Sequence, residues 1–117
     1  MGIDLQVLAS HFRERRDEVV PTASIRFDRD PRLLGQLSLE ARPCLVRQLP
    51  DGLKAGHYDD EGLKFYAVDR YGRPLTFTTP SDLQNLHAPD DLSPWNRAVL
   101  SFLLTLPPDT RLVLYWC

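Results

Sequence analysis

Residues 93–117 carry the clearest pattern of hydrophobic and polar positions in the chain. Ser93 can cap a helix through its hydroxyl, and Pro94 fits the first helical turn, where its missing N–H is not needed. Apolar residues then recur every three or four positions, at Trp95, Ala98, Val99, Phe102, Leu103 and Leu106. The pattern predicts a helix over 94–106 that is buried along this stripe, and prolines 107 and 108 end it.

The chain then closes with Leu112-Val113-Leu114-Tyr115-Trp116. A short run that is apolar at both alternating positions is typical of a strand with covered faces and neighbours on both sides. We therefore predict that this terminal strand lies in the interior of a sheet, directly after the helix.

The first third of the chain gives weaker signals. Residues 3–12 fit both strand alternation and helical spacing, and β-branched residues without a preceding cap favour a strand. The charged run at 13–18 predicts an exposed connection, and residues 23–27 alternate as a second half-buried strand. Asp30-Pro31 and Thr79-Pro80 each predict the start of a short helix.

The middle of the chain reads as an antiparallel meander. Residues 53–58 and 63–68 flank a loop that ends at Gly62, where a glycine suits a left-handed position, and residues 75–79 alternate as a third strand. Together the patterns predict one α+β domain over 1–117. We expect a largely antiparallel sheet of about five or six strands with short helices on one face and a C-terminal helix–strand unit.

Composition agrees with a globular fold, because 43% of the residues are hydrophobic and 26% are charged. The formal net charge of −2 gives no overall attraction to nucleic acid. A local basic group is nearly cancelled by neighbouring acids, so we expect a solvated face and no nucleic-acid partner; it comprises Arg13, Arg15, Arg16, Arg26, Arg29 and Arg32.

Targeting signals and cysteine spacing indicate the cellular compartment in which the protein is expected. No segment is long and apolar enough for a membrane span, and the N-terminus lacks the pattern of a secretory signal. Cys44 and Cys117 show neither a disulfide framework nor metal spacing, which favours a reducing compartment. We expect a cytoplasmic protein without a membrane partner, in which Cys44 is a small core residue.

A sheet with helices on one side leaves its other face open to water or to a partner. Alternation assigns to this open face a mixture of aromatic, aliphatic and hydroxyl side chains, at Lys64, Tyr66, Val68, Thr76 and Thr78. Such a mixture suits an interface with a second copy of the chain or with another protein. Tyrosine is favoured in interfaces, although an ordinary exposed sheet also carries single apolar residues. The acidic turn Asp59, Asp60 and Glu61 lies at the rim of this predicted binding face.

Catalysis is the alternative. His57 beside Asp59 and Asp60 offers a general base and carboxylates for a small hydrolase, or for a metal-dependent enzyme that also uses Glu61. Neighbouring acids at a hairpin tip diverge, and the chain has no HExxH, GxSxG or glycine-rich phosphate loop. We recognise no known family in the sequence. We therefore expect a non-catalytic protein-binding or adaptor protein, such as a component of a larger assembly, without a cofactor or metal.

Overall fold

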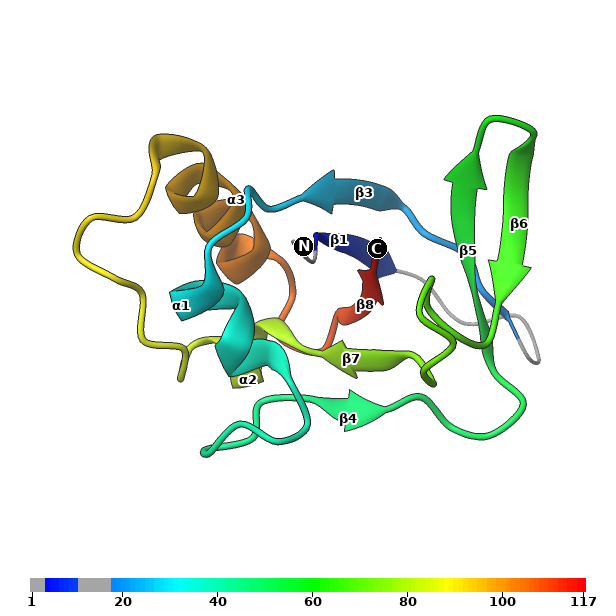
Figure 1. The fold of residues 1–117 in the computed structure, drawn as a ribbon, viewed down its shortest axis with the longest axis horizontal. Helices are drawn as coiled ribbons and strands as arrows, with labels where there is room; N and C mark the ends of the chain where they lie inside the picture. The colour runs from blue at the N-terminus through cyan, green and yellow to red at the C-terminus, as the bar shows by residue number, and fades with distance from the viewer. Residues whose placement is uncertain (1–3, 11–17) are drawn as a thin grey trace.

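The computed structural model describes residues 4–10 and 18–117, and it confirms the α+β class (Figure 1). The elements follow one another as β1 (Leu5–Ser10), β2 (Glu18–Val19), β3 (Ala23–Arg26), α1 (Pro31–Leu34), the 3-10 helix η1 (Gly35–Leu37), β4 (Arg47–Gln48), β5 (Lys54–Asp59), β6 (Gly62–Tyr66), β7 (Thr76–Thr78), α2 (Pro80–Leu83), α3 (Pro94–Thr105) and β8 (Arg111–Trp116). The helix predicted over 94–106 and the strand predicted within 3–12 are thus both present. Within the described ranges no helix is long and apolar enough to cross a membrane.

β8 is the middle strand of an antiparallel five-stranded sheet with the order β3-β1-β8-β7-β4. This confirms the prediction of an interior terminal strand. Leu112 and Leu114 point to the helices, whereas Val113 and Tyr115 point to the opposite side, and each of the four is at most 8% exposed. The sheet therefore has an apolar core on both of its faces.

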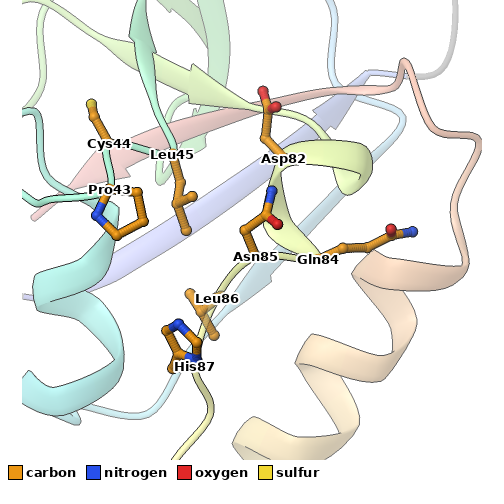
Figure 2. A pocket seen from close by; sticks show the side chains of 8 residues that line it. All are labelled: Pro43, Cys44, Leu45, Asp82, Gln84, Asn85, Leu86 and His87. Atoms are coloured by element: carbon orange, nitrogen blue, oxygen red, sulfur yellow. The ribbon is translucent and has the colours of Figure 1, made fainter.

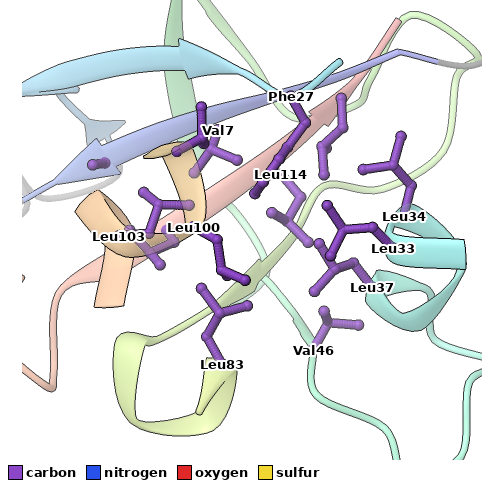
Figure 3. Packing of buried hydrophobic residues seen from close by; sticks show 14 of the residues in the cluster. Val7, Phe27, Leu33, Leu34, Leu37, Val46, Leu83, Leu100, Leu103 and Leu114 are labelled. Carbon is purple, nitrogen blue, oxygen red and sulfur yellow. The ribbon is translucent and has the colours of Figure 1, made fainter. Parts of the chain in front are cut away.

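The helices cover one face of this sheet (Figure 3). α1 and α2 begin where the sequence predicted, because Asp30 and Thr79 cap their first turns and a proline follows each cap. They hold their leucines against β1 and β8, in a core that includes Leu5, Val7, Leu33, Leu37, Leu83, Val99, Leu103, Leu112 and Leu114.

A second sheet, with the order β2-β5-β6, covers the opposite face. Figure 1 shows the helices at one side of the five-stranded sheet and the β5–β6 hairpin at the other. Ala55 and Tyr66 of this hairpin pack with Leu8, Val113 and Tyr115. The prediction that the helices leave one sheet face open is therefore wrong, because β8 is apolar on both faces and both need cover.

The predicted meander is also wrong at its last step. β6 pairs with β5, but β7 pairs with β8 and β4, and only a single bridge between Val68 and Pro74 joins the two segments. The turn between them is tight, because the buried carboxylate of Asp69 accepts hydrogen bonds from the backbone N–H groups of Tyr71 and Arg73. This turn sends the chain from one sheet into the other.

α3 is rotated relative to the predicted stripe. Trp95 and Phe102 are 51% and 40% exposed, whereas Asn96 is 1% exposed. The Asn96 side chain accepts a hydrogen bond from the Asp28 N–H at 2.6 Å and donates one to the Asp28 carbonyl oxygen at 2.9 Å. These two bonds satisfy the strand backbone beyond β3, so the helix turns its asparagine inward and two aromatic rings outward.

We predict that Asn96→Ala lowers the free energy of unfolding by about 1–3 kcal/mol, because both backbone groups of Asp28 lose their partner. Denaturant unfolding followed by circular dichroism measures the change. Ser101→Ala, an exposed position on the same helix, is the control and should leave the midpoint almost unchanged. Equal midpoints for the two variants would contradict the role of Asn96.

Candidate functional site

The β5–β6 hairpin has two different faces, and cross-strand pairing defines them. His57 lies opposite Lys64, whereas Tyr58 lies opposite Leu63 and Gly56 opposite Phe65. Residues that are directly opposite share a face of the sheet. His57 and Lys64 thus belong to the inner face, which looks toward the five-stranded sheet. We call Gly56, Tyr58, Leu63 and Phe65 the outer hairpin face.

His57 joins the two sheets on the inner face. Its ring stacks on Tyr115 with 4.3 Å between ring centroids and an angle of 18°, and the edge of Tyr66 meets it at 6.2 Å. His57 Nε2 lies 2.8 Å from Gln6 Oε1, and the Gln6 amide donates in turn to Ser24 Oγ. With the Gln6 oxygen as acceptor, Nε2 carries the proton. The hydrogen bond to Gln6 and the stacking on Tyr115 thus both hold the ring.

Tyr115 sits in this cluster with an altered acidity. Burial raises the pKa of Tyr115 above its ordinary value, and the neighbouring phenol of Tyr66 acts in the same direction. Losing water penalises the charged phenolate more than the neutral phenol. The cluster therefore favours the neutral phenol of Tyr115.

The catalytic alternative required His57, Asp59 and Asp60 to converge. The His57 ring contacts Gln6 and Tyr115, which lie on strands of the other sheet. Asp60 and Glu61 are exposed in the turn, and Glu61 pairs with Lys64 at 2.6 Å. The side chain of Asp59 lies outside the described part of the structure. Within that described part, no three His, Cys, Asp or Glu side chains form a group that could hold a metal ion.

The predicted binding residues do not form one surface. Lys64 is exposed and Val68 is 39% exposed, but Tyr66 is half-buried in the second core. Thr76 and Thr78 are 7% and 2% exposed, and Thr78 donates to the Leu45 carbonyl oxygen at 2.7 Å. Assigning the two threonines to an open face was wrong, because β7 lies within the five-stranded sheet between β8 and β4.

The outer hairpin face is instead the exposed apolar surface of this hairpin. Tyr58 is 60% exposed and Leu63 is 37% exposed, while Phe65 is half-buried. A Cβ added at Gly56 would lie 2.9 Å from Pro21 Cδ and 3.2 Å from Phe65 Cε1. Glycine therefore lets Pro21 and Phe65 close over the strand. A glycine inside a predicted strand was the available sequence signal for such a close approach.

Three other features of the described surface carry functional groups. Trp95 and Phe102 are exposed on α3, and the Trp95 indole N–H donates to the Arg26 carbonyl oxygen at 2.7 Å. Arg29 pairs with Asp4, and Arg32 pairs with Asp30 and Asp91, as expected for a solvated face, while Arg13, Arg15 and Arg16 lie outside the described residues.

The third feature is an open groove of about 450 Å³ beside α2 (Figure 2). Its lining comprises Pro43, Cys44, Leu45, Asp82, Gln84, Asn85, Leu86 and His87. The prediction of a buried Cys44 is wrong, because Cys44 is exposed and Leu45 and Val46 fill the core in its place. The Cys44 thiol and the His87 ring point away from one another in Figure 2, so they form no nucleophile–base pair.

No family model matches this chain, and neither the curated proteins nor the solved structures contain a detectable match.

The raised pKa of Tyr115 predicts how stability depends on pH. The folded chain holds this proton more tightly than the unfolded chain, in which the pKa is about 10. The stabilisation is complete below that value and is lost as pH rises through the folded pKa. We expect Tyr115→Phe to flatten the loss of stability between about pH 9 and pH 11. Denaturant midpoints across this range measure it.

Tyr58→Phe is the matched control, because it removes a phenol that is 60% exposed. It should leave the alkaline loss of stability as it is in the parent. If both variants followed the parent curve, the buried phenol of Tyr115 would contribute nothing to the pH dependence.

Proposed function

We propose that this chain is a small non-catalytic protein-binding protein, an adaptor or a component of a larger assembly, that binds its partner through the outer hairpin face. The observation that carries the proposal is the exposure of Tyr58 and Leu63 as a cross-strand pair on a regular sheet face. Apolar residues that stand next to one another on an exposed strand face mark interaction surfaces more often than single scattered ones do.

The chemistry of the outer hairpin face suits a protein partner. Tyr58 offers a large ring and a hydroxyl group, which suits a surface that is both apolar and hydrogen-bonding. Leu63 and Phe65 add aliphatic and aromatic area beside it, over the flat backbone of Gly56. Asp60 is exposed in the adjoining turn, so a partner with basic groups at its edge would meet the face faster.

The inner face of the same hairpin supports this assignment. Ala55 is 0% exposed and Tyr66 packs into the second core, so the inner side of the hairpin is used for folding. The hydrolase alternative draws less support, because His57 is held in this same packing by Tyr115 and Gln6. Two free cysteines agree with a cytosolic location, which is part of the proposal.

The test replaces Tyr58 with a photo-crosslinking phenylalanine and irradiates the protein in a lysate of its source organism. We expect a defined protein adduct from position 58 and none from the same probe at Ser101, an exposed position on α3. Identical adduct patterns from both positions would contradict the proposal.

Substitutions measure the contribution of the face once the adduct is identified. Tyr58→Ala and Leu63→Ser should each weaken binding by about tenfold or more, as expected for central interface residues, while the melting temperature changes little. Phe102→Ser removes a similar exposed apolar side chain from α3 and is the control. If Phe102→Ser weakened binding and the hairpin variants did not, the partner would bind α3.

A further inference from the structure

β6 is an edge strand of the second sheet, which has the order β2-β5-β6. In the part of the chain that the structure describes, no strand pairs with its outer side. The strand sequence Gly62-Leu63-Lys64-Phe65-Tyr66 contains no proline, and its register with β5 is unbroken. β6 therefore carries no proline or bulge that would block its edge. Its one charged residue, Lys64, is a side chain of the kind that hinders edge pairing, and it is bound to Glu61 of its own turn.

The turn determines which backbone groups point outward from this edge. A two-residue turn, Asp60-Glu61, joins Asp59 to Gly62. The residues that flank such a turn form a hydrogen-bonded pair, and pairs alternate from there along an antiparallel hairpin. Gly62, Lys64 and Tyr66 thus bond to β5. The N–H and C=O groups of Leu63 and Phe65 point away from β5, toward the edge.

From this edge we infer that β6 binds β6 of a second copy of the chain in antiparallel register, with Leu63 opposite Phe65 of the other copy. The inference rests on the proposed function and names the partner. In this register the outward groups of the two residues meet in both symmetry-related pairs, which gives four backbone hydrogen bonds. If the register shifted by one residue, the outward N–H and C=O groups of one copy would face residues of the other copy whose backbone groups already bond to β5, and the hydrogen bonds could not form.

The side chains fit the same register. On the outer hairpin face, the cross-strand pair Tyr58–Leu63 of one copy lies beside the pair Phe65–Gly56 of the other, so that Leu63 is next to Phe65. An aromatic ring opposite an aliphatic chain is a favourable cross-strand pair. The two outer faces then form one continuous apolar surface across the dimer, and the contact is the same on both copies, as a two-fold axis requires.

Charge also favours the antiparallel arrangement. The axis passes between the two Lys64 residues, and each Lys64 is paired with its own Glu61 at 2.6 Å, so the four groups carry no net charge. The exposed acidic turns of the two copies, each containing Asp60, then lie at opposite ends of the paired strands. A parallel arrangement would place acidic turn against acidic turn.

The first experiment measures the mass of the purified protein by light scattering and sedimentation over a range of concentrations. We expect a reversible, concentration-dependent dimer. Leu63→Pro removes an outward N–H without removing a bond to β5, and it should give a monomer. Leu63→Thr keeps the amide, so it should still dimerise, with weaker affinity. Melting curves establish that both variants fold.

The second experiment tests the register with a single cysteine. In a Cys44→Ser, Cys117→Ser background, Lys64→Cys places two thiols at the axis, where directly opposite residues are close enough for a disulfide. We expect rapid oxidation to a covalent dimer. Ser101→Cys in the same background is the control and should oxidise slowly.

The proposed dimer is contradicted if the protein is a monomer at all concentrations and Lys64→Cys oxidises no faster than Ser101→Cys. The photo-crosslinking test at position 58 separates the two proposals. An adduct with a different protein would then leave the proposed function standing with another partner. Slow oxidation of Lys64→Cys in a protein that does dimerise would also overturn this interface.

Discussion

The structure depends on one strand that has to be covered on both sides. β8 directs Leu112 and Leu114 to the helices and Val113 and Tyr115 to the second sheet. Each buried side chain of this size contributes roughly 1.5–3 kcal/mol, whereas a whole domain is stable by only about 5–15 kcal/mol. Neither face of β8 could be left open without losing much of that stability. The layers of helices, five-stranded sheet and second sheet follow from this requirement.

Features that depend on neighbouring residues were predictable from the sequence. The caps at Asp30, Thr79 and Ser93 start helices at the expected positions, because a cap bonds within its own first turn. The turn glycine Gly62 adopts the expected positive φ. The interior position of β8 was also predictable, since its residues are apolar at both alternating positions, which indicates that both faces of the strand are covered.

Features that depend on distant partners were not predictable. Asn96 looks like a polar surface residue of a helix, and its burial follows from the backbone of Asp28, far away in the chain. The inner and outer faces of β6 were interchanged for the same reason, since alternation separates two faces without saying which one meets the core. Thr78 can be buried because its hydroxyl group donates a hydrogen bond to the Leu45 carbonyl oxygen. For Asn96 and Thr78, a polar atom is buried together with its partner, and hydrophobicity patterns do not record such pairs.

The outer hairpin face is rigid because the inner face of the hairpin packs against the five-stranded sheet. Ala55 lies fully buried against the five-stranded sheet, and His57 stacks on Tyr115 from the neighbouring position on the same face. These contacts fix the backbone of β5, so Gly56 and Tyr58, which alternate with them, are held in a regular strand. Ordering a flexible segment on binding reduces affinity, whereas a segment already ordered by folding avoids that loss. The buried inner face therefore holds the outer hairpin face in the ordered form that the proposed binding needs. The alternation of side chains along the strand separates the residues used for folding from those assigned to the proposed binding.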